Sequence, residues 1–314
     1  MKFILTNKTN LILNLILGLS LFFIKCKRDV EIIPVNSPTN DCIDIPAFQG
    51  TGFGYNYITN GKPIYYAPVL NPNNNNELLI LKQDSAFIYN RISKLTIFSF
   101  KFPFLAKVSW SIKKWMLIGG SDQKIYKIKP NGDSLTLLVN TTNNSFPIWN
   151  DDGNLFSAVN NSINKTIIYT DLGIPIDTIE FTNLPFSSWG GNNKIISGRN
   201  KLFVYDVNTH STNYFYDLGT SGSVTGCFWL NNNEIIWSHI YGILKTNILT
   251  NQTTLLKSTC NSNIYSYPSY DKILNKIIWR KQIQTYVDTY NVKAENKIII
   301  TDVDCNNEEE IIIN

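Results

Sequence analysis

Residues 147–154 read Pro-Ile-Trp-Asn-Asp-Asp-Gly-Asn, and the β-prone run Leu-Phe-Ser-Ala follows at 155–158. Asn, Asp and Gly tolerate the left-handed backbone that a tight turn between two strands requires. The stretch therefore predicts a strand that ends near Trp149, a polar turn, and a second strand. The acidic pair before Gly153 fits this hairpin turn better than a calcium loop, which needs oxygen ligands at alternating positions and a distant Glu.

The same arrangement recurs along the chain with a period near 40 residues, which is typical of repeat architectures. One residue marks each copy, and the steps between successive copies are 41, 39, 40, 40 and 41 residues. These repeat anchors are Val69, Trp110, Trp149, Trp189, Trp229 and Tyr270. A polar turn and further β-rich runs follow each anchor, which gives four short strands per unit.

Four antiparallel strands in about 40 residues form the blade of a β-propeller. We therefore expect an all-β propeller of six four-stranded blades over residues 64–314, with seven blades as the alternative. Residues 27–63 are about one blade long but lack an anchor. They are either a leader that supplies one strand or a diverged seventh blade.

The pattern Pro-x-Trp, a polar turn with Gly, a strand and then Ile-Tyr resembles the propeller repeat of TolB-type periplasmic proteins and WD-like repeats. The best copy is at 147–154, and the resemblance covers residues 64–314. The usual Ser-Pro-Asp-Gly turn is absent, and no Pro stands two residues before Trp189 or Trp229. The Asn- and Ile-rich composition looks like that of exported proteins of the Bacteroidota. The resemblance implies a fold and leaves the activity open.

The first residues look like an export signal. Lys2 and Lys8 give a basic start, residues 11–24 are almost entirely apolar, and Cys26 follows closely. The run is short for a membrane-spanning helix and suits the apolar region of a signal peptide. Residues 1–26 resemble a bacterial lipoprotein signal with Cys26 as the lipid attachment site, although Lys25 stands where that family has a small residue. The alternatives are another exported form and an uncleaved anchor.

The formal net charge of +4 comes from this first segment. Five of the 28 Lys and Arg residues occur before Asp29, which leaves 23 basic against 24 acidic residues in the rest of the chain. The five basic residues are Lys2, Lys8, Lys25, Lys27 and Arg28. The near-neutral remainder has no basic stripe, so a nucleic-acid partner is not expected.

No catalytic, metal-binding or cofactor motif stands out. His210 and His239 lie in different units, and no Gly-x-Ser-x-Gly elbow or nucleotide-binding signature occurs. We interpret the repeat anchors as packing residues between neighbouring blades, because a binding site usually breaks repeat symmetry. The alternative is a ring of aromatic side chains that lines the channel for a sugar or a peptide.

The last repeat unit is longer than the others, with extra residues around 281–296. We interpret this excess as a lengthened hairpin with Tyr286, Asp288 and Tyr290 near its tip. Loops on a rigid scaffold often contain the residues that bind a partner. The hairpin is therefore a candidate contact site, with a plain structural extension as the alternative.

Four cysteines remain if Cys26 carries lipid. Export would permit disulfide bonds. One arrangement joins Cys42 to Cys305, where the ring must close, and Cys227 to Cys260. Buried reduced thiols are the alternative.

These observations predict a non-enzymatic, monomeric scaffold that is anchored to a membrane at the cell envelope, in the outer membrane or periplasm. Its expected ligand is an envelope protein or a glycan, with no cofactor. The alternative function is a propeller hydrolase or lyase that acts on a sugar or peptide in the central channel.

Overall fold

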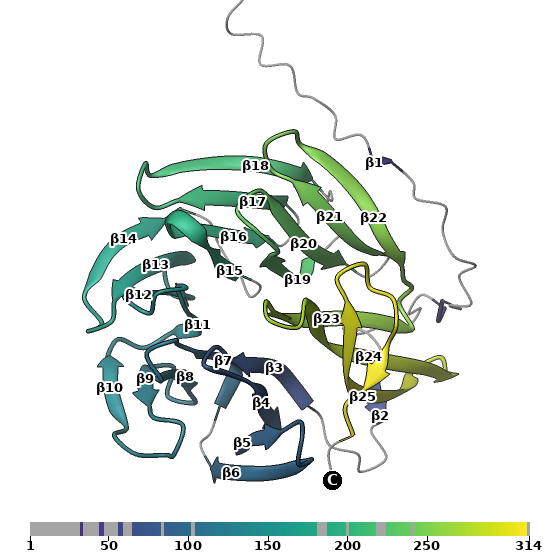
Figure 1. The fold of residues 1–314 in the computed structure, drawn as a ribbon, viewed down its shortest axis with the longest axis horizontal. Helices are drawn as coiled ribbons and strands as arrows, with labels where there is room; N and C mark the ends of the chain where they lie inside the picture. Colours follow the sequence, from purple (N-terminus) through teal and green to yellow (C-terminus); the bar gives the residue numbers. More distant parts are fainter. Residues whose placement is uncertain are drawn as a thin grey trace, which may run out of the picture. The chain divides into compact units, whose positions relative to one another are not determined.

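The computed structural model describes residues 32–33, 44–46, 56–58, 65–82, 85–101, 104–180, 187–198, 201–217, 224–239 and 242–312. These residues form strands and turns, and their one helical element is the single 3-10 turn η1 (Gly191–Asn193). The strands make six antiparallel blades around a ring (Figure 1). The expected all-β propeller with six blades is therefore confirmed.

Each blade is a four-stranded meander that runs from the centre of the ring outward. Blade 1 contains β3 (Tyr65–Asn71), β4 (Asn74–Lys82), β5 (Ser85–Asn90) and β6 (Leu95–Lys101). Blade 2 contains β7 (Phe104–Trp110), β8 (Met116–Gly120), β9 (Ile125–Ile128) and β10 (Thr136–Val139). Blade 3 contains β11 (Asn144–Trp149), β12 (Leu155–Asn160), β13 (Lys165–Thr170) and β14 (Pro175–Ile179).

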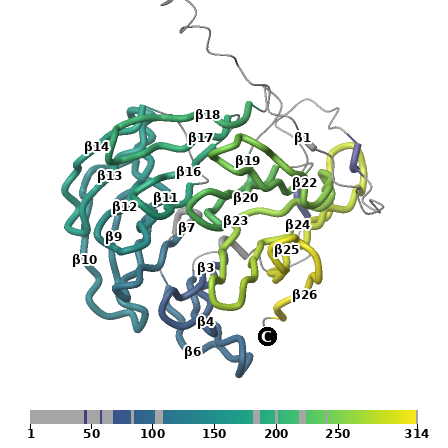
Figure 2. Tube along the Cα trace, turned by 45° about the horizontal axis from the view of Figure 1, so that its top comes forward, coloured from purple at the N-terminus to yellow at the C-terminus, as the bar shows by residue number. Residues whose placement is uncertain are grey.

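The other three blades repeat this order. Blade 4 contains β15 (Ser187–Gly190), β16 (Lys194–Gly198), β17 (Lys201–Asp206) and β18 (Ser211–Asp217). Blade 5 contains β19 (Val224–Trp229), β20 (Glu234–His239), β21 (Gly242–Asn247) and β22 (Gln252–Ser258). Blade 6 contains β23 (Asn263–Asp271), β24 (Lys276–Asp288) and β25 (Asn291–Asp302), and short strands complete its outer edge. The tilted view in Figure 2 shows the outer strands β10, β14 and β18 along the rim of the ring.

The turn between β11 and β12 is the one that the sequence indicates most strongly. Asn150 Oδ1 accepts hydrogen bonds from the backbone N–H groups of Asn154 at 3.1 Å and Leu155 at 3.0 Å. Gly153 has a φ of +70°, and a Cβ at this position would collide with Ser111 in the corresponding turn of blade 2. Glycine therefore provides both the left-handed backbone and the close approach of two neighbouring turns.

Successive residues of the inner strands belong to different hydrophobic cores because side chains of a strand alternate between the two faces of the sheet. In β4, Leu79 and Leu81 pack toward blade 2, whereas Leu78 and Ile80 pack toward blade 6. All four side chains are fully buried or nearly so. Blades that are covered on both faces thus explain the continuous apolar runs in the sequence.

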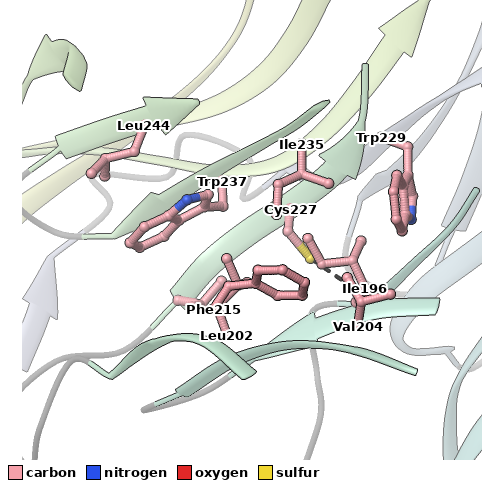
Figure 3. Packing of buried hydrophobic residues seen from close by; sticks show 10 residues of the cluster. Ile196, Leu202, Val204, Phe215, Cys227, Trp229, Ile235, Trp237 and Leu244 are labelled. Carbon is pink, nitrogen blue, oxygen red and sulfur yellow. Dashed lines mark hydrogen bonds between the residues drawn. The ribbon is translucent and has the colours of Figure 1, made fainter. Parts of the chain in front are cut away.

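Among the described residues, one hydrophobic core fills each of the six junctions between neighbouring blades. Figure 3 shows the core between blades 4 and 5, where Phe215 and Leu202 of blade 4 face Cys227 and Trp237 of blade 5. The side chain of Trp237 is fully buried. Burial of one such side chain contributes about 1.5–3 kcal/mol to folding.

Both ends of the described chain complete the outer edges of blades 5 and 6. Strand β2 (Asn56–Ile58) pairs in parallel with β25, and β26 (Glu309–Glu310) pairs with the other end of β25. Strand β1 (Ile32–Ile33) pairs in parallel with β22. The described residues before Tyr65 thus add edge strands to existing blades and form no separate blade.

Blade 1 closes the ring against blade 6 through polar contacts as well as through its core. Arg91 Nη1 lies 3.3 Å from Asp271 Oδ2, and the Asp271 carboxylate is buried. Tyr89 donates a hydrogen bond of 2.8 Å to the carbonyl oxygen of Ile312. The last described residues therefore link the two blades at which the ring closes.

A cluster of charged groups holds the chain after β25 against blades 5 and 6. The Glu308 carboxylate contacts Lys281, accepts a hydrogen bond from Tyr265 at 2.6 Å and lies 3.3 Å from Lys257 Nζ. Burial alone would raise the pKa of Glu308, but the hydrogen bonds from Lys281 and Tyr265 lower it below its usual value. The carboxylate is therefore held in its charged form.

The structure shows the alternative of buried reduced thiols for two of the cysteines, so the bonds Cys42–Cys305 and Cys227–Cys260 are wrong. Cys227 and Cys305 are not disulfide-bonded, and each side chain lies in a different core between two blades. Cys260 is disulfide-bonded. Its partner, like Cys42 and Cys26, lies outside the described residues.

The chain beside Cys260 contacts a segment from near the start of the sequence. The backbone N–H of Asn261 donates to Asp44 Oδ1 at 2.9 Å, and the Asn261 side chain bonds to the backbone N–H and carbonyl of Ile45 at 2.7 and 3.0 Å. These contacts attach residues 44–45 to the connection between blades 5 and 6.

In the ranges that the structure describes, no helix is both long and apolar enough to cross a membrane.

Candidate functional site: the mouth of the central channel

The six repeat anchors come together at one end of the central channel. Strands β3, β7, β11, β15, β19 and β23 lie innermost in the ring, and each runs toward the same face (Figure 1). The anchors stand at or near the ends of these strands, so they surround one opening. We call this opening the channel mouth.

A cavity of about 320 Å³ occupies the channel mouth. Every blade contributes to its wall, and the wall includes all six anchors: Val69, Trp110, Trp149, Trp189, Trp229 and Tyr270. The four Trp side chains are only 4–7% exposed, and each packs in the core between its own blade and a neighbour. The four tryptophans therefore fill the space between neighbouring blades and expose little surface to the cavity.

The indole N–H groups of these tryptophans fall into two pairs. Trp189 Nε1 donates to the carbonyl of Ile148 and to Ser157 Oγ, both at 3.1 Å, and Trp229 Nε1 donates to the carbonyl of Ser188 at 3.3 Å. The buried Nε1 atoms of Trp110 and Trp149 have no hydrogen-bond partner in the described part of the chain. Both nitrogen atoms are shielded from solvent, so they do not face the open space of the cavity.

Two of the serine hydroxyls in the cavity wall join neighbouring blades. Ser109 Oγ accepts a hydrogen bond of 2.9 Å from the backbone N–H of Trp149, and Ser269 Oγ accepts one of 3.1 Å from the N–H of Leu70. No histidine belongs to the residues that line the cavity. The charged residues of the wall are Asp151 and Lys272.

One ion pair crosses the channel mouth. Asp151 Oδ2 lies 3.6 Å from Lys272 Nζ, although the two residues belong to blades 3 and 6, which are opposite each other in the ring. Both side chains are more than half exposed, so the pair adds little to stability. It places one negative and one positive group over the opening, where a partner would meet them.

The two histidines lie outside this cavity. His210 Nδ1 is 3.0 Å from Asp177 Oδ2, which also accepts a hydrogen bond of 2.8 Å from Tyr205. This cluster connects blades 3 and 4, and burial together with the Asp177 contact raises the pKa of Tyr205. His239 stacks on Trp237, and burial lowers the pKa of its imidazole.

The lengthened hairpin predicted in the last unit is formed by β24 and β25, and its tip lies at the opposite end of the blade from the channel mouth. Tyr286 and Tyr290 are 42% and 57% exposed. The Asp288 carboxylate accepts hydrogen bonds from the Asn291 side chain and the Tyr290 N–H, which lower the pKa of Asp288. These residues therefore cap a turn and do not converge with the repeat anchors.

The described residues contain no group of three or more His, Cys, Asp or Glu side chains that could hold a metal ion. The sequence indicated Asp151 only as a turn residue and did not indicate Lys272, whereas the structure brings both to the channel mouth. The Lys-Lys-Trp run at 113–115 is the sequence feature that indicates a second, positively charged region on this face.

Comparison with known proteins supports the fold. No family model matches the chain, and no curated protein matches it. A chain in the crystal structure of the mitotic checkpoint complex is similar, with a TM-score of 0.53, 13% identity, and 74% of each chain covered. The C-terminal WD40 domain of Sif2 is similar with a TM-score of 0.50 and 14% identity, over 76% of this chain and 69% of that domain. These structural neighbours are WD40 β-propellers, and at such identity the likeness concerns the fold.

Proposed function

We propose that this chain is a non-catalytic, WD40-like scaffold that binds a protein partner across the channel mouth. The observation that carries the proposal is a cavity whose wall comes from all six blades and which is crossed by the Asp151–Lys272 ion pair. Around it, turns from successive blades form a broad rim with charges of both signs. Such a rim suits a protein surface better than a small substrate.

Burial of the anchors favours a protein over a glycan. A sugar ring stacks on the open face of an aromatic side chain, whereas the four anchor tryptophans are almost fully buried between blades. The hydrogen bonds of Ser109 and Ser269 to neighbouring backbone groups argue in the same way against a hydrolase or lyase in the channel. The scaffold function needs neither an exposed aromatic platform nor an activated nucleophile.

The proposal extends to location. We place the propeller at the cell envelope, attached through lipid on Cys26, in keeping with the TolB-like repeat pattern and the apolar run at 11–24. Metabolic labelling with a fatty acid tests this part. Label should enter the native chain and be lost in Cys26→Ser, and label that persists in Cys26→Ser would contradict it.

Cross-linking capture from envelope fractions tests the scaffold function. Lys272→Glu places two carboxylates across the channel mouth, and Lys293→Glu makes the same charge change on the opposite face. A partner protein should be captured by the native chain and by Lys293→Glu, and lost by Lys272→Glu. Retention of the same partner by Lys272→Glu, or turnover of a sugar or peptide library by the purified chain, would refute the proposal.

A further inference from the structure

A second cavity opens beside the channel mouth, between blades 1 and 2. Its volume is about 590 Å³, and it is formed by the β3–β4, β7–β8 and β9–β10 turns. The first and third turns of an antiparallel blade lie at the same end, so this cavity opens on the same face as the channel mouth. We call it the lysine groove and define it by Glu77, Trp110, Lys113, Lys114, Trp115 and Lys129.

Positive charge dominates the lysine groove. Three of its side chains are lysines, and all three are exposed. Lys113 lies 3.6 Å from Asp171 of blade 3, but no carboxylate of the described residues lies within ion-pair distance of Lys114 or Lys129. The one acid in the wall, Glu77, accepts hydrogen bonds of 2.8 Å from the side chains of Asn71 and Asn74. Two ammonium groups are therefore left without a counter-charge.

Trp115 in the groove wall is contacted by two lysine ammonium groups, one of which belongs to the groove. The ammonium groups of Lys127 and Lys129 lie 5.1 and 5.6 Å from the centroid of its ring. The negative face of an indole attracts a cation, but two cations on one ring repel each other. An anion bound beside Trp115 would relieve this repulsion.

Trp110 links the lysine groove to the channel mouth. It lines both cavities, it is 6% exposed, and its indole N–H has no partner among the described residues. The two lysines without a carboxylate partner therefore lie in a wall that continues into the channel mouth, so one partner can cover both cavities.

We propose that the lysine groove binds an acidic peptide segment, rich in Asp and Glu, of the protein partner that covers the channel mouth. This inference rests on the proposed function, because it assigns the chemistry of the same partner. Several amide donors of the wall are already committed to Glu77 and Asp133, so few remain for sugar hydroxyls. The free lysines act as point charges, which suit carboxylates on an extended chain.

Fluorescence anisotropy on the full chain tests the inference with a labelled twelve-residue Glu/Asp-rich peptide as the probe. The native chain should bind this peptide, and should bind the matched Gln/Asn peptide at least about tenfold more weakly. Binding should weaken as salt is raised, because contacts between exposed charges are screened.

Two double variants locate the site. Lys114→Glu with Lys129→Glu reverses the uncompensated charges of the groove and should weaken binding at least about tenfold. Lys124→Glu with Lys293→Glu makes the same charge change at the opposite face and should leave binding within about twofold, since those charges lie away from the groove. Thermal unfolding of each variant, and the neutral pair Lys114→Gln with Lys129→Gln, separate loss of binding from loss of fold.

Three results would overturn the inference: no binding of the acidic peptide, equal weakening by both double variants, or tighter binding of a sulfated oligosaccharide than of the peptide. Partner capture that is lost in Lys272→Glu but persists in the groove variant would refute the lysine groove alone. Partner capture that persists in Lys272→Glu would refute the proposed scaffold function.

Discussion

Gly190 offers the sharpest test of how the repeat anchors hold the ring together. A Cβ at this position would lie 2.5 Å from two ring carbons of Trp229 and 2.7 Å from a third. Because carbon atoms pack best about 3.5–4.0 Å apart, the indole would have to retreat by about 1 Å. Trp229 is wedged between blades 4 and 5 and is only 7% exposed, so it has little room to move.

The expected cost of Gly190→Ala follows from these contacts. Overpacking of a tight core costs about 1–3 kcal/mol. Displacement of the indole also breaks its hydrogen bond of 3.3 Å to the Ser188 carbonyl, which adds about 0.5–1.5 kcal/mol. We expect the free energy of unfolding to fall by about 2–4 kcal/mol and the melting temperature by roughly 4–10 °C.

Urea unfolding followed by circular dichroism measures this change. The matched control is Gly191→Ala, whose Cβ would meet the movable end of the Asn232 side chain and should cost less than about 0.5 kcal/mol. Trp229→Leu should reduce the effect of Gly190→Ala, because the clash needs the indole. Equal stability of the two alanine variants, or an unchanged effect in the Trp229→Leu background, would refute the wedge argument.

Three further outcomes concern the closing segment and the cysteines. Hydrogen bonds to Lys281 and Tyr265 lower the pKa of Glu308, so its contribution to stability is present above the unfolded pKa and is lost as the pH falls through the lower folded value. When the pH is lowered from about 7 to about 3, the urea midpoint should therefore fall less in Glu308→Gln than in the native chain. Burial raises the pKa of the Cys305 thiol to about 12, so iodoacetamide should label it slowly in the folded protein and rapidly in urea, and fast native labelling would contradict its enclosure. Non-reducing peptide mapping should recover the Cys260 peptide cross-linked to Cys42, because residues 44–45 contact Asn261, and a Cys260–Cys227 peptide would contradict the structure.

The architecture could be predicted from the sequence because its signals are local. The turn at Asn150 and Gly153 is specified by residues within one hairpin, and the alternation of Leu78 to Leu81 reflects the two buried faces of one blade. Six copies of this unit follow one another at a spacing of 39–41 residues, so the same local structure forms six times. The sequence left six and seven blades open, and the structure decides for six because β1 and β2 pair with the edges of existing blades.

The tertiary structure alone decided which side chains from different blades meet. Asp151 and Lys272 belong to opposite blades, and their contact depends on how six blades close into a ring. The same closure encloses Cys227 and Cys305 in separate cores between blades. The sequence by itself determined the repeating unit, since hairpins and alternating faces are short-range. The site was decided by ring geometry, since it is assembled from residues that are distant in the chain and carry no local mark of their neighbours.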